Sequence, residues 1–417
     1  MKHQLVVVGG GPAGMAAAIA AAEAGVNDIL LIERDDRLGG VLNQCVHNGF
    51  GLLRFGESLT GPEYSEKMAN RVAELPIRVM LSTMVMDLSK DRILTVMNSE
   101  YGVFTVEAGA IILAMGCRER SRGALNIPGA RPAGIYSAGT AQRYVNVEGY
   151  LPGRDVVILG SGDIGLIMAR RMTLEGARVH AVCELMSVSS GLRRNIEQCL
   201  VDFGIPLYLN HTITGIDGKD RVSGVTISEV DPETKRPIPG TEQHIACDTV
   251  LFSVGLVPEN ELTKRAGIAI SPRTRGAVVN QERETEVEGI FAAGNVLHVH
   301  DLADYAAEEA EEAGRAAARY LKNGRRENAR QITLSAGAGI GYVLPQRVAL
   351  PADEVKVYFR VSAPLRDPVF TVKSGDCELM RRKKIAAMPG EMEAITLSRE
   401  MLDKADGEIV IGVEVQK

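Results

Sequence analysis

The chain of 417 residues is long enough for two or three domains that each bury a core. Its 47 basic and 53 acidic residues give a net charge of −6, and without a basic excess we expect no nucleic-acid partner. Aromatic residues amount to only 4% and tryptophan is absent, so stacking platforms for bases or sugars are not expected either.

The N-terminal sequence MKHQLVVVGGG leads directly into an apolar strand and lacks the long apolar segment and cleavage site of a secretory signal. The most apolar helical stretch, Met15 to Ala22, stops at Glu23 and is too short for a membrane span. The six cysteines are scattered without a CxxC pair, which favours a reducing compartment over a disulfide framework or a zinc site. We therefore expect a cytoplasmic protein with no membrane span.

The motif GGGPAG, Gly9 to Gly14, stands between an apolar strand and an alanine-rich helical stretch. Glycines at this spacing allow a tight turn, close approach of the backbone to a pyrophosphate and close helix–strand packing. The helix N-terminus adds free amides and a positive dipole. Glu33 ends the next strand, where a carboxylate can accept hydrogen bonds from ribose hydroxyls. Alone the motif could be a simple turn, but this context predicts a dinucleotide-binding βαβ unit.

The same pattern recurs 151 positions later, as the offset from Gly9 to Gly160 shows. The second copy has a buried-strand run, the turn GSGDIG, a helical stretch and a second strand. The matching residues are Gly9, Gly11, Gly14, Gly25 and Glu33 in the first copy and Gly160, Gly162, Gly165, Gly176 and Glu184 in the second. Two βαβ units predict two nucleotide-binding domains rather than one long sheet.

The second copy favours NAD as its ligand, because the acidic Glu184 at the strand end would repel the 2′-phosphate of NADP. Arg193 and Arg194 follow and could instead serve NADP, although the segment SGLRRNIEQCL is more simply a solvated helix face. We expect NAD, with NADP as the alternative.

The rest of the chain fits around these units. We expect a crossing between domains at residues 126–154, a helix from Ala303 to Lys322 whose run AAEEAEEAG is an exposed face, and short β-strands after residue 331. The basic run RRKK, Arg381 to Lys384, is either a solvated turn or a docking point for an acidic partner.

Over about residues 1–325 the sequence resembles the pyridine nucleotide-disulfide oxidoreductases, flavoproteins with two dinucleotide-binding domains. The motifs that carry the resemblance are GGGPAG with Glu33, the pair Gly39-Gly40, AIILAMG, GSGDIG, SVGLVPEN and TEVEGIFAAGN, Thr285 to Asn295. It implies that the first unit binds FAD, that the second binds NAD(P)H, and that a hydride passes between the nicotinamide C4 and the flavin N5. Asn295 stands where the family usually has Asp and can still donate and accept hydrogen bonds.

The expected fold class is therefore α/β, with two doubly wound Rossmann-like domains, the NAD(P) domain inserted in the FAD domain, and a small C-terminal β-rich domain. The expected ranges are 1–120 and 285–330 for the FAD domain, 121–284 for the NAD(P) domain, and 331–417 for the C-terminal domain.

The resemblance also implies which residues contact the cofactors. For FAD these are Gly9, Gly11, Pro12, Ala13, Gly14, Glu33, Arg34, Gly40, Val41, Val85, Ala114, Met115, Gly116, Gly294, Asn295 and Asp301. For NAD(P) they are Gly160, Gly162, Asp163, Ile164, Gly165, Glu184 and Gly255.

The paired cysteines of the family's disulfide reductases are missing, so we do not expect disulfide reductase activity. The segment GGVLNQCVHNGFG holds one thiol, Cys45, together with His47. These two are the candidate catalytic residues, as a redox thiol or a proton relay beside the flavin. The alternative is a small buried hydrophobe and a loop residue that makes hydrogen bonds. Cys117 is expected to be structural.

Two segments, NQCVHNGFG and GNVLHVHDLADYA, are more similar to flavoprotein subunits that work beside a second dehydrogenase, of the glycerol-3-phosphate, opine and proline types. This implies a partner dehydrogenase or electron carrier as the source or acceptor of electrons. The alternatives are a self-contained NADH oxidase or amine or amino-acid dehydrogenase, and a non-catalytic flavin-bearing assembly subunit. A homo-oligomer is an open alternative.

The polar cluster His298, His300, Asp301 and Asp304 contains residue types that bind metals. We expect no metal site, because no further ligand stands out at a suitable spacing. The start of the following helix is instead expected to point its amides at the electron-rich end of the flavin.

Overall fold

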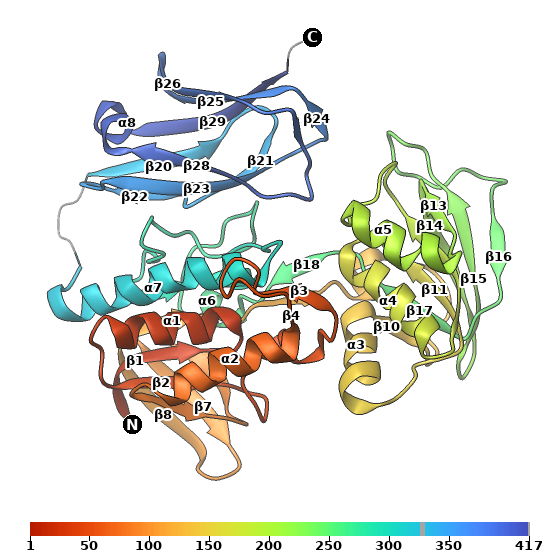
Figure 1. Ribbon diagram of the computed structural model, residues 1–417, viewed down its shortest axis with the longest axis horizontal. Coiled ribbons are helices and arrows are strands. Elements are labelled where there is room, and N and C mark those ends of the chain that lie inside the picture. Colours follow the sequence, from red (N-terminus) through yellow and green to blue (C-terminus); the bar gives the residue numbers. More distant parts are fainter. Residues whose placement is uncertain (326–329, 416–417) are drawn as a thin grey trace. The chain divides into compact units, whose positions relative to one another are not determined.

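The computed structural model describes residues 1–325 and 330–415 (Figure 1). The chain forms two compact units, the first from Met1–Cys117 and Pro258–Lys417 and the second from Arg118–Val257. The second unit is therefore an insertion in the sequence of the first. Within the described residues, no helix combines the length and the apolar character that a membrane crossing requires.

The first unit is built on a sheet with the strand order β5-β2-β1-β8-β7-β6, in which β19 also pairs with β8. Its central strands are continuous apolar runs and pair in parallel, as expected for a sheet that is buried on both faces. The strands before the insertion are β1 (Lys2–Val8), β2 (Ile29–Ile32), β3 (Asn48–Phe50), β4 (Leu59–Thr60), β5 (Ile77–Met80), β6 (Met84–Leu88), β7 (Ile93–Asn98) and β8 (Gly102–Leu113), and β19 (Ile290–Ala292) follows it.

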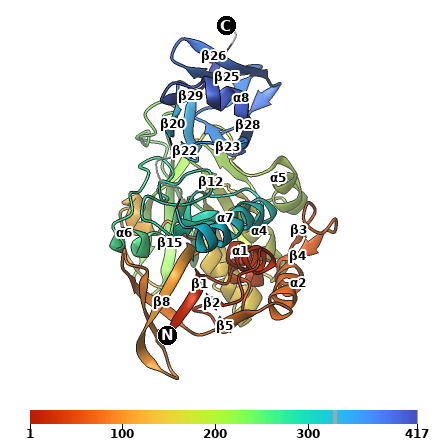
Figure 2. The same cartoon turned by 90° about the vertical axis from the view of Figure 1, so that its left-hand side faces the viewer.

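Helices α1 and α7 pack against each other beside this sheet (Figure 2). Their contact is made by small residues, and a Cβ added to Gly314 would lie 2.3 Å from the carbonyl oxygen of Ala17. The helices of this unit up to α7 are α1 (Pro12–Glu23), α2 (Gly61–Ala73), α6 (Glu261–Arg265) and α7 (Ala303–Asn323), with 3-10 turns η1 (Gly40–Gln44) and η5 (Gly294–Val296). The helix expected from Ala303 to Lys322 is thus confirmed.

The second unit has a parallel sheet with the order β10-β17-β11-β12-β13 and a separate antiparallel sheet, β14-β15-β16. Two short strands, β9 (Cys117–Glu119) and β18 (Leu256–Pro258), lie at its two ends and pair with each other. The elements between them are η2 (Arg122–Leu125), β10 (Ile135–Ser137), α3 (Ala138–Arg143), η3 (Tyr144–Glu148), β11 (Asp155–Leu159), α4 (Asp163–Leu174), β12 (Arg178–Glu184), α5 (Arg193–Cys199), η4 (Val201–Phe203), β13 (Leu207–Leu209), β14 (His211–Gly218), β15 (Val222–Glu229), β16 (Gln243–Ile245) and β17 (Thr249–Phe252).

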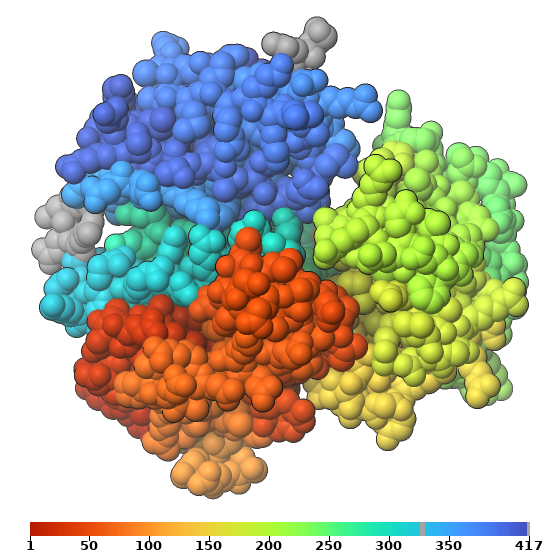
Figure 3. All heavy atoms as spheres, viewed as in Figure 1, coloured from red at the N-terminus to blue at the C-terminus, as the bar shows by residue number. Residues whose placement is uncertain are grey.

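The C-terminal part is rich in β-structure, as expected, and forms sheets with the orders β22-β20-β29-β25-β26 and β21-β23-β28. Its elements are β20 (Gln331–Ala336), β21 (Ile340–Leu344), β22 (Arg347–Ala349), β23 (Glu354–Val361), β24 (Leu365–Arg366), β25 (Pro368–Ser374), β26 (Cys377–Lys383), β27 (Ala386–Ala387), β28 (Glu393–Ser398), α8 (Arg399–Lys404) and β29 (Glu408–Val415). The space-filling view shows the blue atoms of this part directly against the cyan atoms of α7 (Figure 3).

The compact units differ in extent from the expected ranges. Residues 258–284 were assigned to the inserted domain, but their apolar side chains, such as Ile268 and Val279, share a buried cluster with strands β1 and β8 of the first unit. Leu344 and Tyr358 of the C-terminal part belong to the same cluster. Local patterns do not reveal this shared burial, because the apolar residues are covered by strands that are distant in the sequence.

The basic run RRKK was expected to be either a solvated turn or a docking point for an acidic partner. The structure places its first three residues in strand β26 rather than in a turn. Arg381 and Arg382 lie in β26, and Lys384 follows its end. Both Arg382 and Lys384 pair with the buried carboxylate of Glu393.

We predict that Gly314→Val destabilises the protein by at least about 2 kcal/mol, because the added side chain would overlap the backbone of α1. The matched control is Arg315→Val at the next position, where the arginine side chain is 49% exposed and the cost should stay near 0.5 kcal/mol. Urea unfolding followed by far-UV circular dichroism measures both. Equal losses in the two variants would contradict the close contact of α1 with α7.

Candidate functional site

The first glycine motif forms the turn between β1 and α1. Gly9 has φ +104°, and a Cβ there would lie 2.5 Å from the carbonyl oxygen of Ala114. A Cβ on Gly14 would lie 1.7 Å from the carbonyl oxygen of Gly9, so the helix approaches the strand as closely as a glycine allows. Apart from Gly11 itself and its two neighbours in the chain, no atom of the described residues lies within 4 Å of a Cβ built on Gly11. The turn therefore has no space for a side chain at Gly9 or Gly14 but has space beside Gly11.

The helix that follows offers unpaired amides at this opening. Gly11 is the N-cap of α1 and makes no side-chain capping hydrogen bond within the described residues, and Pro12 is the first residue of the helix. The first N–H groups of such a helix have no partner inside the helix, and the helix dipole makes this end positive. An anionic group such as a pyrophosphate fits this opening.

The carboxylate of Glu33 fixes the shape of the turn. It stands directly after β2, is buried, and accepts hydrogen bonds from the backbone N–H groups of Gly10 at 2.6 Å and Asp35 at 2.8 Å. Each carboxylate oxygen can accept a further hydrogen bond, so Glu33 can still bind a ribose hydroxyl.

Two distant segments meet the same turn. A Cβ on Gly40 would lie 3.2 Å from the Cα of Gly11, and a Cβ on Gly294 would lie 2.6 Å from the Cβ of Ala13. A side chain at Gly294 would displace Ala13, and one at Gly40 would press on the backbone of Gly11. The expected residues Gly9 to Gly14, Glu33, Gly40 and Gly294 are thus brought together.

The second motif repeats this geometry in the second unit. Gly160 has φ +99°, and a Cβ on Gly165 would lie 2.5 Å from its carbonyl oxygen. Gly162 is the N-cap of α4 without a side-chain cap among the described residues, and the nearest atoms to its Cβ position are 3.7 Å away. The opening at Gly162 therefore corresponds to the opening at Gly11.

Glu184 takes the place of Glu33 in this copy. It is buried at the end of β12 and accepts hydrogen bonds from Ser161 N–H at 3.0 Å and Met186 N–H at 2.9 Å. Asp163 uses its carboxylate inside the protein, where it accepts from Leu192 N–H and from the side chain of Asn195. Both bonds are to the Oδ1 atom, so this oxygen is held within the protein and positions the start of α5.

The remaining expected contacts fall into three groups. Ala114, Met115 and Gly116 directly follow β8, beside the first turn, while Ile164 lies in the first turn of α4 and Gly255 just after β17. Arg34 and Val41 are exposed, whereas Val85 is buried in the core against the sheet.

Asn295 and Asp301 are already engaged by other residues. The side-chain amide of Asn295 donates to Cys117 Sγ at 3.6 Å, and its oxygen accepts from His300 N–H at 2.9 Å. The carboxylate of Asp301 pairs with Arg360 and accepts from Met392 N–H. Asp301, expected at the cofactor, thus joins the loop after η5 to the C-terminal strands.

The candidate catalytic pair lies after η1. Cys45 is half-buried, its thiol donates to the carbonyl of Val41 at 3.3 Å, and desolvation raises its pKa to about 12. The ring of His47 lies 5.1 Å from that of Phe50. A thiol with so high a pKa stays protonated at neutral pH, which favours the structural interpretation of Cys45.

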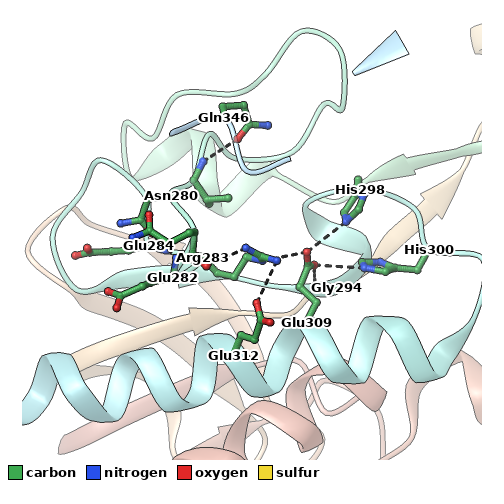
Figure 4. Close-up of polar contacts among 12 residues, drawn as sticks. Asn280, Glu282, Arg283, Glu284, Gly294, His298, His300, Glu309, Glu312 and Gln346 are labelled. Carbon is green, nitrogen blue, oxygen red and sulfur yellow. Dashed lines mark hydrogen bonds and ion pairs between the residues drawn. The ribbon is translucent and has the colours of Figure 1, made fainter. Parts of the chain in front are cut away.

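A buried polar cluster surrounds Glu309 of α7 (Figure 4). Its carboxylate accepts hydrogen bonds from Arg283 Nε at 3.1 Å and from Gly294 N–H at 3.0 Å, and it faces His298 and His300. Burial raises the pKa of Glu309, but the neighbouring His298, Arg283 and His300 outweigh it and hold that pKa below its ordinary range. Burial lowers the pKa of His300 to about 3, so its ring is neutral at pH 7.

Glu309 is the residue that sequence analysis missed. The run AAEEAEEAG was expected to be an exposed helical face, but Glu309 is fully buried, three residues after Ala306 and four before Ala313, which are buried too. The signal available in the sequence was the spacing of Glu309 from these alanines, because residues three or four apart lie on the same face of a helix. With His298 and His300, Glu309 also supplies the third possible metal ligand that the sequence alone did not provide.

We predict that Cys45 reacts with iodoacetamide at least about 100-fold more slowly than the exposed Cys377 at pH 8, because a thiol of pKa near 12 is only about 0.01% thiolate there. Peptide mass spectrometry of samples quenched over time measures both rates, and Cys377→Ser confirms the peptide assignment. Modification of Cys45 as fast as that of Cys377 would instead favour a redox thiol.

Residues 3–310 match the family described as pyridine nucleotide-disulphide oxidoreductase. The chain is 30% identical over 290 residues to the hydrogen cyanide synthase subunit HcnB of Pseudomonas protegens, a match that covers 64% of this chain and 60% of that protein. It is 26% identical over 297 residues to a thioredoxin reductase of Mycolicibacterium smegmatis, which covers 71% of this chain and 88% of the relative.

A solved thioredoxin reductase of T. acidophilum has the same fold, with a TM-score of 0.62 at 24% identity over 76% of this chain and 98% of that one. This similarity confirms the expected fold class with two Rossmann-like domains. The family match includes both glycine motifs and the segment that leads into α7. The chain therefore belongs to the pyridine nucleotide-disulphide oxidoreductase family of FAD-dependent NAD(P)H oxidoreductases.

Proposed function

We propose that this chain binds FAD at the first glycine motif and NAD(P)H at the second, and that a hydride passes between the two cofactors. The observation that carries the proposal is the duplicated turn, closed by backbone contacts at Gly14 and Gly165 and open at Gly11 and Gly162. FAD, when bound, supplies the capacity to take up a hydride and to release its electrons to a further acceptor.

The residues of the chain act by binding and orientation. The N-termini of α1 and α4 provide amides and positive dipoles for the two pyrophosphates. Glu33 and Glu184 are held by backbone N–H groups, so their remaining acceptor positions are fixed before a ribose arrives. No nucleophilic side chain is required for this chemistry.

We propose NADH as the preferred nicotinamide cofactor. Glu184 is buried at the end of β12, and its negative charge would face a 2′-phosphate at short range. Arg193 and Arg194 are exposed at the start of α5 and remain the groups that would serve NADPH. A higher kcat/KM for NADPH than for NADH, lost on replacing both arginines by alanine, would reverse the assignment.

We further propose that the electrons pass to or from a partner dehydrogenase subunit or a small electron carrier. The thiol of Cys45 is protonated, which does not favour it as a redox group that takes electrons from the flavin. One relative is, by name, a subunit of hydrogen cyanide synthase. The acceptor is thus expected outside this chain.

The proposal is tested by the visible spectrum of the purified protein, recorded without oxygen before and after one equivalent of NADH. We expect a flavin spectrum that bleaches on addition. A flavin spectrum that neither NADH nor NADPH changes would contradict the nicotinamide site, and a colourless protein that takes up no FAD would contradict the whole proposal.

We predict that Gly11→Val and Gly162→Val separate the two binding functions. Both changes add a side chain where the described structure leaves room, so the fold should be retained. Gly11→Val should weaken FAD binding by more than about tenfold, or about 1.4 kcal/mol, by filling the opening. Gly162→Val should retain FAD but lose reduction by NADH to a similar degree. The opposite pattern would exchange the two assignments.

We predict that the isolated holoprotein consumes NADH slowly in air and quickly with an artificial electron acceptor. An oxygen electrode and a dye-reduction assay measure the two rates. Fast turnover with oxygen alone would identify a self-contained NADH oxidase instead.

A further inference from the structure

Three buried side chains bring their possible ligand atoms together beside α7. They are His298 and His300 on the segment after η5 and Glu309 on the helix, and their ligand atoms all lie within 4.8 Å of one another (Figure 4). Each of the three side chains is at most 1% exposed, so bulk water does not solvate the nitrogen and oxygen atoms that face each other.

The hydrogen bonds of Asn295 fix the tautomer of His300. The backbone N–H of His300 donates to the side-chain oxygen of Asn295, which identifies that atom as an acceptor. His300 Nδ1 lies 3.2 Å from the same oxygen and must therefore carry the proton. In a neutral ring Nε2 then presents a lone pair.

This lone pair faces a carboxylate. His300 Nε2 lies 3.5 Å from Glu309 Oε2 and has no hydrogen-bond partner among the described residues. Two acceptors that face each other in a buried site repel unless a cation or a proton lies between them. The site at His300 is thus incomplete as it stands.

His298 also turns one ring nitrogen to a protein oxygen and the other to Glu309. Its Nδ1 lies 3.1 Å from the hydroxyl of Tyr342, and its Nε2 lies 3.3 Å from Glu309 Oε1. Metal-binding histidines commonly bond one ring nitrogen to an oxygen of the protein, which orients the other nitrogen toward the metal. Both imidazoles here have that second bond.

The distances to the carboxylate suit shared ligation. An N–H···O hydrogen bond is usually about 2.9–3.0 Å long. Two ligand atoms of one tetrahedral ion at about 2.0–2.1 Å lie about 3.3–3.4 Å apart. The distances from His298 Nε2 to Glu309 Oε1, 3.3 Å, and from His300 Nε2 to Glu309 Oε2, 3.5 Å, are close to this value, so each histidine lies at a ligand-to-ligand distance from one oxygen of the carboxylate.

The charged groups around the site pair with one another. Arg283 Nε bonds to Glu309 Oε1, and its Nη2 lies 3.2 Å from Glu312 Oε2, so one guanidinium faces two carboxylates. The neighbouring pairs, Arg360 with Asp301 and Lys356 with Glu308, are each balanced. Arg283 is thus shared between Glu309 and Glu312.

We propose that His298, His300 and Glu309 bind one divalent transition-metal ion of the class that accepts imidazole and carboxylate ligands, such as Zn²⁺. Imidazole nitrogen with carboxylate oxygen suits Zn²⁺ and its neighbours better than Mg²⁺ or Ca²⁺. The ion joins the segment of His298 and His300 to α7, and three protein ligands leave a coordination position for one small ligand.

The test begins with the full-length holoprotein, purified without added metal and without a metal-binding tag. Elemental analysis should find about one equivalent of a transition metal per chain, or the chelator-treated protein should take up about one equivalent of Zn²⁺ and melt several degrees higher. A protein that holds no metal as purified and neither binds nor is stabilised by Zn²⁺ or Co²⁺ would overturn the proposal.

The decisive variant is His300→Asn, because asparagine keeps a donor near the position of Nδ1 and removes Nε2. We expect Zn²⁺ affinity to fall by more than about 100-fold, since even changes outside the ligand set cost about 10- to 100-fold. The matched control is His244→Gln, whose histidine is exposed in a pair with Asp217 and should leave binding unchanged.

Flavin content is measured in every variant, so that lost FAD is not mistaken for a lost metal. If His300→Asn fails to fold, His298→Asn provides the same comparison, and the metal content of the unaltered protein still decides. Zn²⁺ binding that survives both histidine changes lies elsewhere and would also overturn the proposal.

Discussion

The buried carboxylate of Glu309 joins three segments of the first unit, which depends on it for their relative placement. It is fully buried and accepts from Arg283 and from the backbone of Gly294, which lies against the N-terminus of α1. Removing one partner of a buried ion pair typically costs about 3–5 kcal/mol, because the other charge is left without compensation. One helix residue thus fixes the segments before and after β19 relative to the first glycine turn.

The two glycine turns share the same close backbone contacts and the same position of a buried glutamate. In each copy the last glycine of the motif meets the carbonyl of the first, and a buried glutamate bonds to the backbone next to that first glycine. The copies differ in what lies around them. Beside the first lie Gly40 and Gly294, while in the second Asp163 holds the start of α5 through Leu192 and Asn195.

Local patterns predicted much of this structure. Spacing alone located both βαβ units, the helix from Ala303 and the β-rich C-terminal part. The sequence did not reveal contacts between distant segments, such as Asp301 with Arg360 or residues 258–284 with the first sheet. The burial of Glu309 was missed for a related reason: an acidic run looks solvated until the neighbouring alanines of its helix are known to face the core.

The C-terminal strands are bonded to the loop that follows η5. Arg360 donates to the carbonyl of Val299 and pairs with Asp301, and Tyr342 bonds to His298. These strands also share a core with the first sheet through Leu344 and Tyr358. These contacts are a physical route by which the two regions can be coupled, and any such coupling is reciprocal. If a ligand that orders the loop beside Gly294 also stabilises β21 and β23, then a partner bound to those strands must strengthen binding at the loop by the same free energy.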